Sequence, residues 1–180
     1  MTTRSPQGGM PPPFPITLAT RITLARLLMI PAIVALLSIW PNARWWAVAL
    51  FLGAALTDWL DGYVARRLNQ VSDLGKILDP LVDKLLILVP LLLCIEWHVV
   101  PAWSVALILA RELGIASWRI RQPRIQGANL WGKAKTVSQI VAVALLLAPL
   151  PASWHTLTMI IYGGAIALTL ISGWTYLRAG

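Results

Sequence analysis

Five of the seven acidic residues of this 180-residue chain lie in one stretch, TDWLDGYVARRLNQVSDLGKILDPLVDKLL. Asp58 and Asp61 are three residues apart, and Asp79 and Asp83 are four apart. On a helix, either spacing places both carboxylates on one face. The short link between the two pairs predicts antiparallel neighbouring helices, so the four carboxylates should converge on one small volume.

Four carboxylates at one place repel each other unless something neutralises them. Protonation would relieve the repulsion, but a divalent cation does so more completely. A set of oxygen donors without His or Cys favours Mg²⁺, Mn²⁺ or Ca²⁺ over zinc. Arg66 and Arg67 follow the first pair, and a metal ion beside arginine suits a polyphosphate. Asp73 falls in the predicted link 69–75, and we expect a solvated loop residue there, outside the site.

Small residues accompany the carboxylates. Gly62 and Ala65 lie on or near the acidic face, and Gly75 precedes Asp79 by four residues. They would leave room for a nucleotide. Small residues are also common where helices pack in lipid, so packing alone is an equal alternative for each.

The elements that must position these residues are apolar helices. The chain is 58% hydrophobic and only 12% charged, and apolar runs of about 20 residues, enough to cross a bilayer, recur along it. A soluble helical core is disfavoured, because such runs leave almost no polar face.

We predict an all-α polytopic membrane protein with a polar active-site cavity on the cytoplasmic side. A flexible Pro/Gly-rich tail, 1–16, should precede one membrane domain, 17–180. Six helices are expected, at Thr20–Trp40, Arg44–Leu68, Lys76–Trp97, Pro101–Arg121, Leu130–Ala148 and Trp154–Leu177.

The basic residues predict the orientation. With a cytoplasmic N-terminus, thirteen of the 15 Lys and Arg fall on or toward the cytoplasmic side, Arg111 lies inside a span and Arg44 lies outside. Tryptophans gather at the opposite helix ends, as in an interfacial belt. Both termini should therefore be cytoplasmic. The net charge of +8 follows topology and forms no stripe on a soluble surface, so it indicates no nucleic-acid partner.

The acidic stretch reads D-x2-D-G-x2-A-R-x8-G-x3-D-x3-D, with eight fixed positions over 26 residues. It resembles the signature of the CDP-alcohol phosphotransferase family, and no position departs from it. The segments LATRITLARLLMIP, ARELGIASWRI and GANLWGKAKTVSQIVAVALLL look like those of bacterial members that use glycerol 3-phosphate. The resemblance covers about residues 17–150.

The resemblance implies an integral membrane enzyme that transfers a phosphatidyl group from CDP-diacylglycerol to an alcohol and releases CMP. It also implies two divalent cations, Mg²⁺ or Mn²⁺, and a homodimer among membrane lipids. Asp58 and Asp79 would bridge both metals, Asp61 would hold one, and Asp83 would hold the other and act as the general base. The remaining motif residues would serve CDP-diacylglycerol, as contacts or by leaving room for it: Gly62, Ala65, Arg66, Ser72 and Gly75.

If the acceptor is glycerol 3-phosphate, its phosphate needs cations. Arg111 lies deep in the fourth helix beside Glu112, and we expect it to face the cavity, because neighbours on a helix point apart. A structural pair between the two is the alternative. Lys133 and Arg26 are the further candidates, although Lys133 could equally be a positive-inside anchor.

The sequence leaves the identity of the acceptor alcohol open, because Thr17, Ala19 and Thr20 stand where bacterial relatives commonly have Asn-x-Pro-Thr. Inositol phosphate and phosphatidylglycerol are alternative acceptors with the same chemistry. A cation transporter lined by acids is the remote alternative, but such a path needs polar groups near the bilayer midplane and on both sides.

Overall fold

The computed structural model describes residues 18–68, 73–121 and 130–178. Within these ranges it describes the backbone throughout. It also describes the side chains, except those of residues 18–21, 41, 58–68, 73–77, 118–121, 130 and 177. This part of the chain is all-helical, with six α-helices and two 3-10 turns, which confirms the all-α prediction. The helices are α1 (Leu18–Ile39), α2 (Arg44–Leu68), α3 (Asp73–Glu96), α4 (Ala102–Arg121), α5 (Leu130–Leu147) and α6 (His155–Arg178). The 3-10 turns are Pro41–Ala43 and Ala152–Trp154. The expected tail, 1–16, lies outside the described residues.

The observed helix ends agree with the predicted ones within a few residues, and the largest difference is at the start of α3. This helix begins at Asp73 rather than Lys76, so the assignment of Asp73 to a loop was wrong. An acidic residue in the first turn interacts favourably with the positive end of the helix dipole, which favours the earlier start. At its other end α3 is followed by His98 with a left-handed φ of 57°, and Val99 N–H bonds back to the Cys94 carbonyl.

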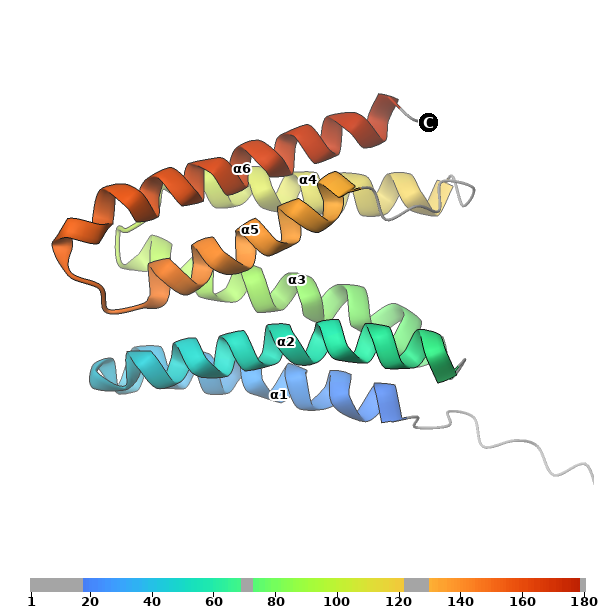
Figure 1. Ribbon diagram of the computed structural model, residues 1–180, viewed down its shortest axis with the longest axis horizontal. Helices are drawn as coiled ribbons and strands as arrows, with labels where there is room; N and C mark the ends of the chain where they lie inside the picture. The colour runs from blue at the N-terminus through green and yellow to red at the C-terminus, as the bar shows by residue number, and fades with distance from the viewer. Residues whose placement is uncertain (1–17, 69–72, 122–129, 179–180) are drawn as a thin grey trace, which may run out of the picture.

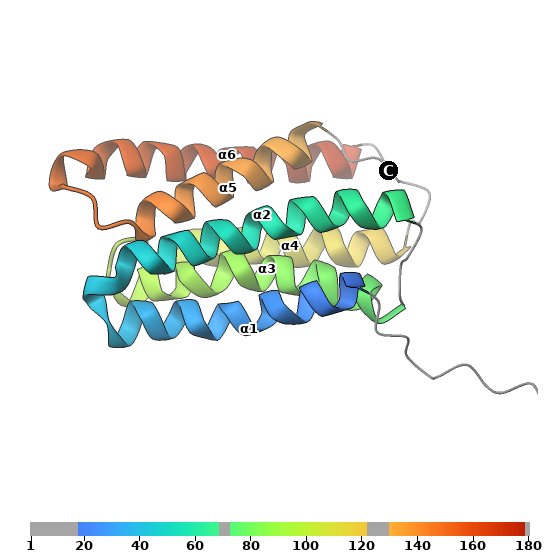
Figure 2. The same ribbon diagram turned by 60° about the horizontal axis from the view of Figure 1, so that its bottom comes forward.

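The six helices lie roughly alongside one another as a bundle (Figures 1 and 2). Helix α1 packs on α2 and α3, α5 packs on α2, α3 and α6, and α4 packs on α3 and α6. The start of α1, the end of α2, the start of α3 and the end of α6 all lie at the same end of the bundle (Figure 1). The acidic stretch is therefore at this end, which we call the acidic end.

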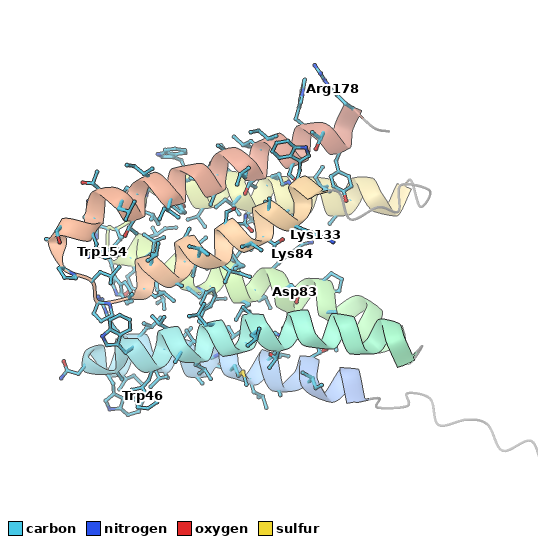
Figure 3. The ribbon with its side chains drawn as sticks, in the orientation of Figure 1. Trp46, Asp83, Lys84, Lys133, Trp154 and Arg178 are labelled. Atoms are coloured by element: carbon cyan, nitrogen blue, oxygen red, sulfur yellow. The ribbon has the colours of Figure 1, made fainter. Side chains whose placement is uncertain are left out.

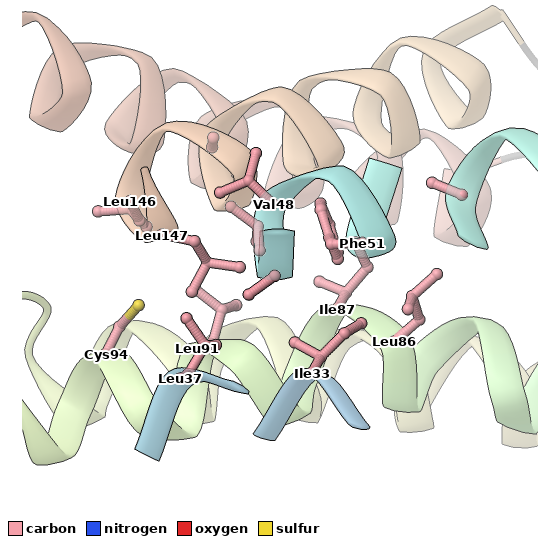
Figure 4. Packing of buried hydrophobic residues seen from close by; sticks show 14 of the residues in the cluster. Ile33, Leu37, Val48, Phe51, Leu86, Ile87, Leu91, Cys94, Leu146 and Leu147 are labelled. Carbon is pink, nitrogen blue, oxygen red and sulfur yellow. The ribbon is translucent and has the colours of Figure 1, made fainter. Parts of the chain in front are cut away.

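The core between α1, α2, α3 and α5 is apolar. Ile33 of α1, Phe51 of α2, Leu91 of α3 and Leu147 of α5 are at most 2% exposed and pack within one cluster (Figure 4). Interlocked side chains from four helices fix how those helices lie relative to one another. The core therefore holds the ends of α1, α2 and α3 in place at the acidic end.

Large apolar side chains also cover the outside of the bundle. Leu28 of α1, Leu92 of α3, Leu113 of α4, Val137 of α5 and Ile160 of α6 are each more than half exposed. By length and composition, two stretches within the described residues could cross a membrane, Ile22–Ile39 and Ala152–Tyr176, and Arg44–Thr57 is a shorter apolar helix. Trp46 and Trp154 lie at the end of the bundle away from Asp83 and Arg178 (Figure 3).

Candidate active site

Helix α1 presents two polar side chains to two aspartates of α3, Asp79 and Asp83. Thr23 Oγ1 donates a hydrogen bond to Asp79 Oδ1 at 2.5 Å, and Arg26 Nη1 donates to Asp83 Oδ1 at 2.8 Å. The donors are three residues apart on one helix and the acceptors four apart on the other, so each pair is about one turn apart along packed helices. This contact between α1 and α3 orients both carboxylates.

Burial differs between the two sides of this contact. Thr23 and Arg26 are only 3% and 2% exposed, whereas the Asp83 side chain is 43% exposed. The donors are thus fixed in the packed interior, while the Asp83 carboxylate lies where solvent or a substrate can reach it. A guanidinium beside a carboxylate stabilises the ionised carboxylate, which is the form able to accept a proton or bind a cation.

The other half of the predicted acidic cluster lies on α2. Asp58 and Asp61 fall in the second half of that helix, which packs on α3. Their side chains lie outside the described residues, as do those of Gly62, Ala65, Arg66 and Gly75, and Ser72 lies outside entirely. No group of three acidic, His or Cys side chains able to hold a metal occurs among the side chains that are described. Convergence of the four carboxylates therefore stays a prediction.

The donors that are described fit a hard divalent cation. Asp79 and Asp83 are carboxylates one turn apart on one helix face, and neither is fully buried. Carboxylate oxygens are the ligands that Mg²⁺ and Mn²⁺ prefer. The Thr23 hydroxyl bound to Asp79 is the kind of outer hydrogen bond that orients a metal-binding carboxylate.

A second polar cluster joins α4, α5 and α6. Glu112 Oε1 accepts hydrogen bonds from Arg111 Nη1, at 3.1 Å, and from Lys135 Nζ, and Arg111 Nη2 donates to Ser172 Oγ at 2.6 Å. The three charged side chains are only 10–14% exposed. Lys84 of α3 lies close enough to Lys135 to interact with it electrostatically. Two cations share one carboxylate here, so the cluster carries a net positive charge suited to an anion.

The structure changes two expectations about the cations. Arg111 and Glu112 are paired, so the argument that sequence neighbours point apart was wrong, because the long arginine side chain can turn back to the adjacent carboxylate. Lys133 is exposed at the surface of α5, whereas Lys135, two residues later, is buried on Glu112. Figure 3 shows Lys133 and Lys84 in the same half of the bundle as Asp83.

The sequence predicted Glu112 only as a possible partner of Arg111, and it did not predict the contacts that Thr23, Lys135 and Ser172 make. Glu112 and Lys135 carried a signal, because each is an ionisable residue within an apolar helix and needs a partner there. Thr23 and Ser172 carried none, because single hydroxyl residues occur in many apolar helices. Only the packing of α1 on α3 and of α4 on α6 reveals their roles.

One cavity lies at the other end of the molecule. It has a volume of about 150 Å³ and lies between the end of α5 and the start of α6, with Leu146, Trp154, His155 and Met159 in its lining. Its lining is largely apolar and contains no acidic residue. We therefore place the candidate site at the described carboxylates and cations and not in this cavity.

An all-helical bundle with large apolar side chains on its outside and with Asp79 and Asp83 held by polar side chains of α1 defines a class, that of helical membrane proteins. Within this class, the sequence signature of the CDP-alcohol phosphatidyltransferase family matches residues 16–171. The chain belongs to this family, which confirms the resemblance seen in the acidic stretch. Its apolar helices and its family indicate a membrane protein, and the family uses divalent metal ions.

Curated relatives cover most of the chain. The chain is 37% identical over 179 residues to CDP-diacylglycerol–glycerol-3-phosphate 3-phosphatidyltransferase of Bacillus subtilis, covering 88% of this chain and 92% of that protein. It is 38% identical over 175 residues to the protein of the same name from Pseudomonas fluorescens, covering 88% and 87%. A third protein of that name, from Salmonella choleraesuis, is 37% identical over 180 residues, and the alignment covers 89% of this chain and 92% of that protein.

Proposed function

We propose that the chain is a phosphatidyltransferase of phosphatidylglycerol biosynthesis. It converts CDP-diacylglycerol and sn-glycerol 3-phosphate into phosphatidylglycerophosphate and CMP. The observation that carries this proposal is the agreement between relatives of that name along nearly the whole chain and a complete acidic motif. The same relatives support glycerol 3-phosphate over inositol phosphate or phosphatidylglycerol as the acceptor.

The reaction needs a hydroxyl made nucleophilic. The acceptor oxygen forms a bond to the phosphorus that carries diacylglycerol, the bond from that phosphorus to the CMP oxygen breaks, and CMP leaves. We assign Asp83 as the general base that takes the hydroxyl proton, since its side chain is partly exposed and is held in place by Arg26.

Asp58, Asp61, Asp79 and Asp83 would hold two divalent cations, Mg²⁺ or Mn²⁺. When bound, these ions neutralise the carboxylates, polarise the phosphate and stabilise the leaving group. The chain's own contribution is orientation, since Thr23 and Arg26 fix the carboxylates of α3. Gly62, Ala65, Arg66, Ser72 and Gly75 are proposed to accommodate and contact the cytidine diphosphate.

For the acceptor phosphate we propose Arg111, Lys133 and Arg26. Arg26 already contacts Asp83, so a cation for the acceptor phosphate would stand beside the base that takes the acceptor proton. In glycerol 3-phosphate the phosphate and the reacting hydroxyl are only a few bonds apart, so adjacent groups on the protein suit it. Arg111 contributes a planar fork that matches phosphate oxygens.

We further propose six membrane spans with both termini and the site on the cytoplasmic side. Exposed apolar side chains on all six helices support the spans. The basic residues on the same side as the acidic stretch support the orientation. In this arrangement the acyl chains of the donor stay in the bilayer while its headgroup reaches Asp83. A homodimer, which the family resemblance implies, is part of the same proposal.

A CMP-release assay tests the activity. Purified chain in mixed micelles with CDP-diacylglycerol and Mg²⁺ or Mn²⁺ should release CMP with glycerol 3-phosphate, and Asp83→Asn should reduce the rate by at least about a hundredfold, as loss of a general base does. Inositol phosphate, phosphatidylglycerol and serine are the comparison acceptors. CMP release that prefers one of these would change the acceptor, and no release with any of them would overturn the proposed function.

A further inference from the structure

Helix α6 contacts Arg111 of α4 through two consecutive residues, Ser172 and Gly173. The fully buried Ser172 hydroxyl accepts the hydrogen bond from Arg111 Nη2 at 2.6 Å. A Cβ atom placed on Gly173 would lie 3.2 Å from Arg111 Cγ and 3.3 Å from its Nε. The guanidinium and the aliphatic stem of Arg111 are therefore both seated on α6.

The close approach at Gly173 is a local feature of this helix. Gly163 and Gly164 also lie in α6, and a Cβ atom on either would meet nothing within 4 Å. At those positions a larger residue would be accommodated, whereas at Gly173 the arginine stem would have to move. Gly173 thus allows the Arg111 side chain to lie directly against α6, where a Cβ would displace it by a few tenths of an ångström.

Arg111 is held at both ends of its planar group. Nη1 bonds to Glu112 on its own helix and Nη2 bonds to Ser172 on α6, which fixes the plane of the guanidinium. A binding group contributes most when it is ordered before the ligand arrives, because little conformational entropy is then lost on binding. Arginine has several rotatable bonds and would otherwise sample many orientations.

We propose that Ser172 and Gly173 are positioning residues that orient Arg111 toward the phosphate of the acceptor. The inference rests on the proposed function, in which Arg111 binds that phosphate. Both residues lie beyond residues 16–171, which the family signature covers, so family membership does not assign them. They give the last helix a part in selecting an anionic acceptor over a neutral alcohol.

The test compares four variants of the full-length protein in the CMP-release assay. Ser172→Ala removes the hydroxyl and Gly173→Ala introduces the Cβ. Gly164→Ala is the matched control for the second, because a Cβ there meets nothing within 4 Å. Thr175→Val is the control for the first, because the Thr175 hydroxyl donates, among the described residues, to the Ser172 carbonyl of its own helix and not to α4. For each variant, KM is measured separately for glycerol 3-phosphate and for CDP-diacylglycerol, together with kcat and the melting temperature in detergent.

Ser172→Ala should raise KM for glycerol 3-phosphate about tenfold, the effect of losing a hydrogen bond to a charged group. Gly173→Ala should raise the same KM, because the added Cβ displaces the Arg111 side chain. KM for CDP-diacylglycerol should stay unchanged, and both controls should behave like the parent protein. A lower melting temperature together with equal changes in both KM values would overturn the inference, because Ser172 and Gly173 would then have a purely structural role.

Arg111→Ala distinguishes phosphate binding by Arg111 from the positioning role of Ser172 and Gly173. If it raises KM for glycerol 3-phosphate while Ser172→Ala and Gly173→Ala do not, the positioning role is wrong and the binding role of Arg111 stands. If Arg111→Ala leaves that KM unchanged, Arg111 does not bind the acceptor and both assignments fall. CMP release with glycerol 3-phosphate in either case leaves the reaction itself supported.

Discussion

At the scale of single residues, the site is organised by hydroxyl and guanidinium donors that orient carboxylates. Thr23 is 3% exposed and donates to Asp79, which we propose as a metal ligand. A carboxylate held by one fixed donor presents its other lone pairs in a defined direction, which favours binding of a cation. Thr23 should therefore affect metal affinity although it is not an expected ligand.

Thr23→Val, which keeps the side-chain shape and removes the hydroxyl, should weaken the apparent affinity for Mn²⁺ about tenfold, as removal of an outer hydrogen bond to a metal ligand does. The rate of CMP release measured against Mn²⁺ concentration checks this. The rise of melting temperature with added Mn²⁺ gives an independent readout. Thr23→Ser retains the donor and should behave like the parent, and equal Mn²⁺ affinity in the Val and Ser variants would contradict the role of Thr23.

At the scale of helices, a buried hydrogen bond joins α5 to α6. Gln139 Nε2 donates to Thr169 Oγ1 at 2.9 Å, and the two side chains are 5% and 0% exposed. In lipid the separated helices find other partners for their polar groups, so such a bond contributes only modestly to stability. The contact lies on the helix that also carries Ser172.

Thr169→Val should lower the free energy of unfolding by about 0.6 kcal/mol, the average for interhelical hydrogen bonds in a membrane protein. Unfolding in mixed micelles with increasing SDS measures this, and kcat should not change. Thr136→Val is the matched control, because Thr136 is exposed and bonds only to the Gly132 carbonyl of its own helix. An equal loss in both variants would mean that helix propensity and not the contact between α5 and α6 is responsible.

The helices could be predicted from the sequence because their signals are local. Apolar runs and breaks at Pro41, Pro101 and Pro151 mark where helices stop and start, and the observed ends follow them closely. Local sequence signals do not determine which helices pack against each other, since every apolar helix offers similar side chains to its neighbours in lipid. The contact of Thr23 with Asp79, 56 residues apart, could therefore not be predicted, whereas the pairing of Asp79 with Asp83 on one face could.

At the scale of the whole molecule, the two ends of the bundle carry different side chains. Asp83 and Arg178 lie toward one end and Trp46 and Trp154 toward the other (Figure 3). Arg44 is the basic residue expected on the outer side, and its guanidinium lies 4.3 Å from the centre of the Trp97 ring. An aromatic face offers a cation a partner at a membrane surface, which accounts for this exception to the charge bias.

The orientation of the bundle predicts which residues can be labelled from outside a cell. Cys94 is the one cysteine of the chain and is fully buried, so Cys94→Ala provides a background without thiols. In it, Ser153→Cys, at the exposed turn before α6, should react with a membrane-impermeant maleimide on intact cells. Arg178→Cys, exposed at the end of α6, should react only after the cells are opened. Labelling of Arg178→Cys and not Ser153→Cys on intact cells would place the candidate site on the outer face, where neither CDP-diacylglycerol headgroups nor glycerol 3-phosphate from the cytoplasm could reach Asp83.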